Sequence, residues 1–141
     1  MKFEIHHHEG AGPVRFGMTT TEVRKALGSK FKNGTRGSSP QHPYDYFKEY
    51  GCFVYYNMDG KMDAIEFGER GQPTLGGENL LGLSFKDLFK RIKKLDAGLK
   101  WDGTGFISKK LGVGSYAPMG DSEPKKPAEG FIVFRKGYYD K

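Results

Sequence analysis

The residues that could do chemistry in this chain are few and scattered. Cys52, the single cysteine, lies inside the apolar run CFVYY, and His42 stands between two prolines in a loop-like segment. Carboxylates such as Asp45 and Glu49 lie at spacings without a catalytic pattern. A nucleophile, a base and an orienting group cannot be assembled from these residues. The sequence therefore predicts a protein that is not an enzyme and holds no cofactor.

Two local patterns resemble ligand-binding motifs but lack their essential parts. The segment 10–17, GAGPVRFG, has neither the Lys-Ser/Thr pair of a phosphate-binding loop nor a strand-turn-helix setting. The run from His6 to His8 could bind a metal, but it is flanked only by Glu4 and Glu9, with no second ligand cluster at a suitable spacing. We therefore expect a connecting turn at 10–17, surface histidines at 6–8 and no metal site.

Composition places the chain among small single-domain proteins. Its 141 residues can bury one core, and the lone cysteine excludes an internal disulfide and favours a reducing compartment. The sequence shows no apolar run long enough to span a bilayer and no apolar segment typical of a secretory leader at residues 1–10. The expected location is the cytoplasm, with no membrane partner.

The positive charge has a clear pattern along the chain. The formal net charge is +6, which permits attraction to nucleic acid or to an acidic protein. Much of the excess lies in segment 86–94, where Lys and Arg alternate with apolar residues at helical spacing. That arrangement is typical of the solvated face of an amphipathic helix.

A capping pattern occurs twice and fixes the predicted architecture. Segments 17–23 (GMTTTEV) and 82–88 (GLSFKDL) both read G-[ML]-[ST]-x-x-[ED]-[VL]. Thr19 and Ser84 occupy the N-cap position, with an acidic residue three positions later near the positive end of the helix. Apolar residues at helical spacing follow each cap. The pattern predicts helices over 20–27 and 85–96.

Strand signals follow each predicted helix. Runs of aromatic and β-branched residues predict strands at 44–47, 52–57 and 63–67 in the first half and at 105–110, 111–117 and 130–136 in the second. Because strands are grouped after helices, we expect an α+β fold with two tandem helix-plus-antiparallel-meander modules (about 12–70 and 78–138). The two modules would form one sheet with helices on one face, in a single domain over residues 1–141.

This organisation resembles a known fold. Two tandem modules opening with G-[ML]-[ST]-x-x-[ED]-[VL] resemble the β-lactamase inhibitor protein and the related outer-membrane assembly lipoproteins. The lipoproteins need a signal peptide and a lipidated N-terminal cysteine, which Cys52 cannot supply. The segments GPVRFGMTTTEVRKALG, YFKEYGCFVYYNMDGKMDAIEF and LLGLSF also resemble small bacterial immunity proteins to polymorphic toxins. The resemblance implies a protein that inhibits another protein.

The hairpin centred on Asp59-Gly60 predicts which side chains face outward. A two-residue turn would pair Tyr56 with Asp63 and place the apolar partners of both strands on the buried face. The opposite row is then predicted to be an open, partner-binding face, to which the second half adds Val133. The predicted partner-binding residues are Phe53, Tyr55, Glu66, Tyr116, Phe131 and Arg135. The alternative is that loops such as 29–43, or a dimer mate, cover this face.

The sequence thus predicts an immunity protein that covers a toxin with its open sheet face. Its net charge favours an acidic toxin domain or enzyme as the partner. One alternative is single-stranded nucleic-acid binding, with aromatic side chains stacking on bases and cations neutralising phosphates. Its residues would be Phe53, Tyr55 and Tyr116 for stacking and Lys109, Lys110, Arg135 and Lys136 for the phosphates. The other alternative is an unrecognised enzyme with a cleft between the modules.

Overall fold

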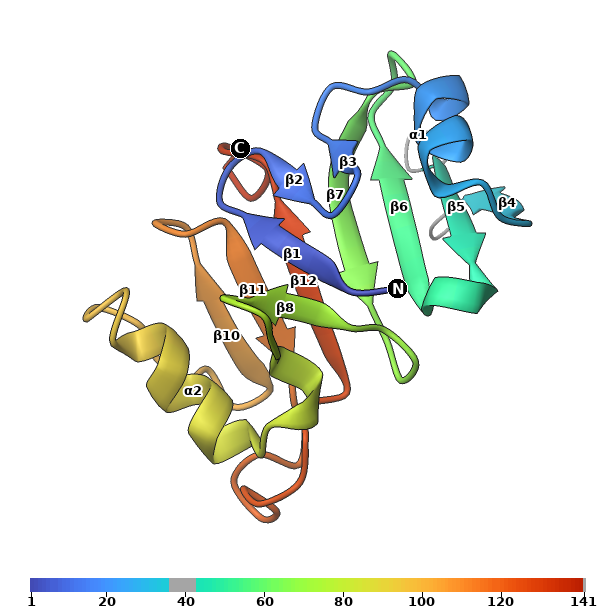
Figure 1. The fold of residues 1–141 in the computed structure, drawn as a ribbon. Helices are drawn as coiled ribbons and strands as arrows, with labels where there is room; N and C mark the ends of the chain where they lie inside the picture. The colour runs from blue at the N-terminus through green and yellow to red at the C-terminus, as the bar shows by residue number, and fades with distance from the viewer. Residues whose placement is uncertain (36–42, 141) are drawn as a thin grey trace.

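A seven-stranded antiparallel sheet forms the centre of the protein (Figure 1). The structure is a computed structural model that describes residues 1–35 and 43–140. The strand order is β10-β11-β12-β7-β6-β5-β4, so the meanders of the two halves meet where β7 pairs with β12. The strands are β4 (Lys32–Thr35), β5 (Pro43–Phe47), β6 (Cys52–Tyr56), β7 (Met62–Phe67), β10 (Gly105–Ser108), β11 (Val113–Tyr116) and β12 (Gly130–Phe134). The predicted α+β fold, with both modules in one sheet, is confirmed.

A second, five-stranded sheet was not predicted from the sequence. Its order is β3-β2-β1-β8-β9, and β1 and β8 pair in parallel although they are far apart in the chain. The strands are β1 (Phe3–His6), β2 (Gly10–Ala11), β3 (Val14–Arg15), β8 (Pro73–Leu75) and β9 (Glu78–Asn79). Strands this short leave almost no alternation of apolar and polar residues to recognise.

Both predicted helices begin at the expected caps. Helix α1 (Thr20–Leu27) opens with a full capping box, because Thr19 Oγ1 accepts from the Glu22 amide while Glu22 Oε1 accepts from the Thr19 amide. Helix α2 (Phe85–Lys93) has only the first of these bonds, from the Asp87 amide to Ser84 Oγ. Two 3-10 helices, η1 (Lys48–Tyr50) and η2 (Leu80–Gly82), complete the elements of the described residues.

The core lies between the seven-stranded sheet and the layer formed by both helices and the five-stranded sheet (Figure 1). We call the face of the seven-stranded sheet that this layer covers the inner face. The core joins apolar residues from the helices, the five-stranded sheet and the inner face, including Val23, Leu27, Phe85, Leu88, Ile92, Phe3, Ile5, Val54, Ile65, Phe67, Phe106, Phe131 and Val133. The apolar stripe of each helix is therefore satisfied by this layer, as the sequence predicted.

The hairpin between β6 and β7 departs from the expected two-residue turn. Met58, Asp59 and Gly60 form the loop, with Gly60 in the left-handed region, and the amide of Asn57 donates to the carbonyl of Lys61. A β-bulge between Tyr55 and Tyr56 then leaves an extra residue on β7, so Tyr56 pairs with Met62 and not with Asp63. The extra loop residue and the bulge shift the strand register in opposite directions. The pairs Phe53–Glu66 and Tyr55–Ala64 therefore match the sequence prediction.

Candidate binding surface

The face of the seven-stranded sheet opposite the inner face, which we call the outer face, carries a tyrosine-rich set of side chains. The strand register shows which residues lie on the outer face. Glu66 pairs with Phe53 on one side and with Ile132 on the other, while Ala64 pairs with Tyr55 and Phe134. Residues alternate between faces along each strand. The outer face therefore contains Lys32, Gly34, Tyr44, Tyr46, Phe53, Tyr55, Ala64, Glu66, Gly105, Ile107, Gly114, Tyr116, Gly130, Ile132 and Phe134.

Four outer-face aromatics on β5 and β6 pack against one another. Tyr46 stacks on Phe53 with ring centroids 4.5 Å apart, and Tyr44 meets both Phe53 and Tyr55 edge to face. We call these four residues the aromatic ladder. The sequence prediction missed Tyr44 and Tyr46, although the alternation of residues 44–47 would have placed them on the face opposite Phe47.

Tyr55 lies on the outer face, as predicted, but it is not an exposed anchor. Its side chain is only 7% exposed and belongs to a small second cluster with Ala64, Ile132 and Phe134. Its hydroxyl donates to Glu66 Oε1 at 2.6 Å. The side chain of Tyr55 therefore holds the Glu66 carboxylate in place and leaves little ring surface for a partner to contact.

The second half of the outer face is hollowed. A depression of about 250 Å³, which we call the outer hollow, is lined by Glu66, Asp102, Thr104, Phe106, Ile107, Ser115, Tyr116, Gly130, Ile132 and Tyr139. Tyr116 is 51% exposed, and Ile107 and Tyr139 are also exposed. The lack of a side chain at Gly130 contributes to the depression, because a Cβ there would point between Tyr116 Cβ and Glu66 Oε2.

Phe131 and Val133 do not belong to this surface. Phe131 pairs with Phe67 and Val133 pairs with Ile65, and all four side chains are fully buried in the core. The prediction that Phe131 and Val133 face outward is therefore wrong by one residue of alternation. The connection between β11 and β12 is long and irregular, so no short turn fixed the register of β12 as the hairpin fixed that of β7.

Arg135 lies apart from Tyr116. Tyr116 pairs with Gly130 at the start of β12, whereas Arg135 follows its last residue, which places them about 17 Å apart along the strand. Arg135 Nε donates to Asp63 Oδ1 at 2.6 Å, at the bulge of β7. The structure therefore brings together Phe53, Tyr55 and Glu66 on the outer face, with Tyr116 at the rim of the outer hollow.

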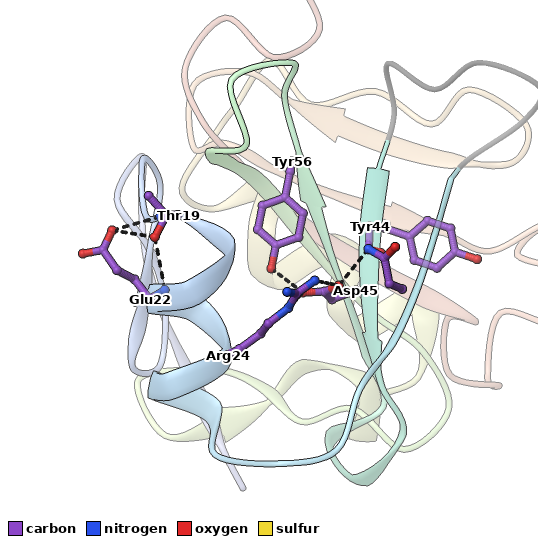
Figure 2. Close-up of polar contacts among 7 residues, drawn as sticks. Thr19, Glu22, Arg24, Tyr44, Asp45 and Tyr56 are labelled. Carbon is purple, nitrogen blue, oxygen red and sulfur yellow. Dashed lines mark hydrogen bonds and ion pairs between the residues drawn. The ribbon is translucent and has the colours of Figure 1, made fainter.

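A buried polar centre lies on the inner face at the start of the first meander (Figure 2). Asp45 is fully buried and accepts from Arg24 Nε at 2.8 Å, Arg24 Nη2 at 2.9 Å, the Tyr56 hydroxyl at 2.8 Å and Asn33 Nδ2 at 3.2 Å. Burial and the bond to Asp45 raise the pKa of Tyr56. Both oxygens of the carboxylate are occupied, so this centre anchors α1 to β5 and offers no atom for catalysis.

The other residues considered for chemistry are also bound or buried. Burial raises the pKa of the Cys52 thiol to about 12, so it is not a nucleophile at neutral pH. His7 Nδ1 and His8 Nε2 lie within hydrogen-bonding distance of the carbonyls of Leu111 and Lys110. His42 lies outside the described residues. Within residues 1–35 and 43–140, His, Cys, Asp and Glu form no group of three or more that could hold a metal.

Comparison with known proteins supports the fold and goes no further. No protein-family description matches the chain, and no curated protein matches its sequence. The crystal structure of the uncharacterized protein YfeY from Escherichia coli is similar, with a TM-score of 0.58 and 15% sequence identity. The alignment covers 96% of this chain and 100% of that chain. The likeness therefore extends over both modules of the fold.

The helices are short and amphipathic. Among the described residues, none forms a helix with the length and apolar character needed to cross a membrane.

Proposed function

We propose that this protein binds and inhibits another protein through the outer face of its seven-stranded sheet, as an immunity protein covers a toxin. The observation that carries the proposal is the outer hollow, where Tyr116, Ile107 and Tyr139 are exposed. Tyrosine is enriched at protein interfaces because it offers a large apolar surface and a polar tip with few rotatable bonds.

The position of the surface also favours protein recognition. Most of the outer face is formed by strands paired through backbone hydrogen bonds, and in pre-organised complexes the interface backbone moves little on binding. The core beneath Tyr116 is independent of it, since Phe131 and Val133 fill the inner face. A partner could therefore be recognised without disturbing the packing that keeps the protein folded.

Single-stranded nucleic-acid binding fits the geometry less well. Of the cations that would neutralise phosphates, Lys109 pairs with Asp140 and Arg135 pairs with Asp63. The ring of Tyr55, which would stack on a base, is buried. Attraction to phosphates would therefore rest on exposed lysines such as Lys110, Lys136 and, on the outer face, Lys32.

The residues that line two other depressions do not favour an enzymatic function either. These two depressions in the described part of the chain, of about 460 and 500 Å³, are lined by residues such as Glu69, Leu81 and Glu129 in one and Ser29, Lys48 and Glu49 in the other. Neither lining contains a histidine or a cysteine, so neither offers the usual pairing of a nucleophile with its base.

The charge of the partner depends on the surface it meets. The lysines that favour an acidic partner lie on the exposed side of α2, which packs on the inner face through Phe85 and Phe89. The outer face carries the carboxylate of Glu66 near its middle and the cation of Lys32 on its edge strand β4. An acidic toxin domain would thus have to approach the α2 side, and the outer face favours other chemistry.

The test is affinity capture from the native host with three forms of the protein. We expect wild type to retain one protein in a stoichiometric amount at physiological salt. Tyr116→Ala should lose most of it, because truncating an interface anchor costs about 2 kcal/mol or more. The matched control is Leu95→Ala, since Leu95 is 40% exposed at the end of α2, away from the outer face. Recovery of nucleic acid, or equal losses with both variants, would contradict the proposal.

A further inference from the structure

The outer hollow has an acidic lining in a basic protein. Glu66 and Asp102 contribute carboxylates to it, and none of its described lining residues is a Lys or Arg, although the chain carries 23 Lys and Arg against 17 Asp and Glu. Among the described residues neither carboxylate forms an ion pair, whereas Asp45, Asp63, Glu78, Glu123 and Asp140 each do. Within the described residues, the hollow therefore holds two carboxylates that no ion pair neutralises.

Both carboxylates are held in fixed positions by neutral donors. Tyr55 donates to Glu66 Oε1, and Glu66 Oε2 lies toward Gly130, on the floor of the hollow. Asp102 Oδ1 accepts from the amides of Thr104 and Gly105, and these bonds lower its pKa and keep it ionised. Neutral donors fix the direction of a carboxylate without cancelling its charge.

Aromatic rings complete the lining. Tyr116 rises from the end of β11 at one part of the hollow, and Tyr139 contributes from the segment after β12. The faces of tyrosine rings attract cations, and a planar guanidinium can stack on them while its N–H groups reach a carboxylate. Two carboxylates and two tyrosines are the groups that such a cation needs.

The size of the hollow selects one side chain. Pockets for drug-sized ligands occupy roughly 300–1,000 Å³, and this depression of about 250 Å³ is smaller and open. It is suited to the end of a long side chain presented by a larger molecule. A free metabolite would leave most of its surface in water.

We propose that the outer hollow receives an arginine side chain of the protein partner, with the guanidinium between Glu66 and the rings of Tyr116 and Tyr139. The inference rests on the proposed function, because the arginine belongs to the protein that the outer face binds. Tyr55 is a positioning residue, which holds Glu66 and does not itself contact the arginine.

The test is an NMR titration of the full chain with N-acetyl-arginine methylamide, with the norleucine analogue as an uncharged probe. We expect saturable shifts of the amides of Glu66, Tyr116 and Gly130 with a dissociation constant in the millimolar range, and no saturable binding of the norleucine probe. Raising the salt to about 0.5 M should weaken the arginine binding several-fold, since much of the attraction is between exposed charges.

Three variants separate the hollow from the rest of the surface. Glu66→Gln should weaken arginine binding at least about threefold, because it removes the charge and keeps the shape. Gly130→Ala should do the same by filling the floor, and its Cβ would meet its neighbours only at ordinary contact distances of 3.5 Å or more. Gly98→Ala is the matched control, since its Cβ would also fit and it lies outside the hollow. Its amide shifts at the hollow and its affinity for the arginine probe should match those of wild type.

Equal binding of the two probes, shifts mapped to other surfaces, or an unchanged affinity in Glu66→Gln would overturn the arginine assignment. Loss of the partner in Tyr116→Ala together with failure of the probe would leave the binding face standing and remove only the arginine. Probe binding at the hollow, together with partner capture that no outer-face variant affects, would overturn the proposed function and with it the assignment of the arginine to that partner.

Discussion

The inner and outer faces of the seven-stranded sheet are built from the same strands but by different chemistry. Inner-face residues such as Phe67 and Phe131 are fully buried beneath helices and the five-stranded sheet. Outer-face residues such as Tyr116 and Glu66 end in polar groups, and the hollow beside them is lined by carboxylates and tyrosines. Most of the core therefore lies on the inner face, whereas the outer face adds only the small cluster around Tyr55 and leaves Tyr116 exposed for the binding that we propose.

The largest effect should come from truncating the inner face. Phe131→Ala removes a fully buried ring and leaves a cavity, so we expect a loss of about 3–5 kcal/mol in the free energy of unfolding. Tyr116→Ala, on the adjacent strand and the other face, should change it by less than about 0.5 kcal/mol. Urea denaturation of both variants makes the comparison. Similar losses in the free energy of unfolding would contradict the claim that the inner face contributes more to stability than the outer face.

The polar anchor of α1 should come next. Asp45→Ala leaves Tyr56 and Arg24 without their acceptor, and we expect a loss of about 2–4 kcal/mol because water solvates only part of the Arg24 guanidinium. The control is Glu49→Ala, an exposed carboxylate whose bond to Ser29 lies at the surface. An equal, small effect of both substitutions in thermal unfolding would mean that the buried pair contributes nothing to holding α1.

Alkaline pH should lower the free energy of unfolding through the thiol of Cys52. Its pKa is about 12 in the folded protein and 9.0 when unperturbed, so folding favours the protonated thiol. This contribution is complete below pH 9 and is lost as the pH rises toward 12, by up to about 1.4 kcal/mol per pH unit. The raised pKa of Tyr56 acts in the same direction. Denaturation curves at pH 8 to 11 test this expectation, and Cys52→Ala should show a shallower decline than wild type.

The smallest effects belong to the two helix caps. Thr19→Ala should cost about 1 kcal/mol, and Ser84→Ala somewhat less. The Thr19 hydroxyl both accepts from the Glu22 amide and donates to Glu22 Oε1, whereas the Ser84 hydroxyl only accepts from the Asp87 amide. Binding should be unaffected, since both caps lie on the layer that covers the inner face. The stability of each variant is measured by thermal unfolding, and a larger loss at Ser84 would contradict the difference between the caps.

Elements with strong local signals could be predicted from the sequence. The repeated caps located both helices, and the Asp59-Gly60 turn placed Phe53, Tyr55 and Glu66 on the correct face. The predicted end of the second helix at residue 96 was three residues too far, because the chain turns after Lys93 with the Leu95 amide bonded to the carbonyl of Ile92.

Features that depend on distant contacts could not be predicted. The parallel pairing of β1 with β8 and the buried bonds of Asp45 with Arg24 join segments that are distant in the chain. Such contacts produce no local sequence pattern from which they could be predicted. The outward assignment of Phe131 failed because its register is set by pairing with β7 and not by a nearby turn. Likewise, the burial of Tyr55 and the outer hollow depend on residues from several strands.

The central claim is that the outer face contacts the partner, and hydroxyl-radical footprinting of the captured complex tests it most directly. Tyr116 and Ile107 on the outer face, and Met58 and Leu95 elsewhere, are all exposed and oxidisable in the free protein. We expect oxidation of Tyr116 and Ile107 to fall several-fold in the complex while Met58 and Leu95 keep their rates. Protection of Leu95 with unchanged oxidation of Tyr116 would place the partner on the α2 side and contradict the account.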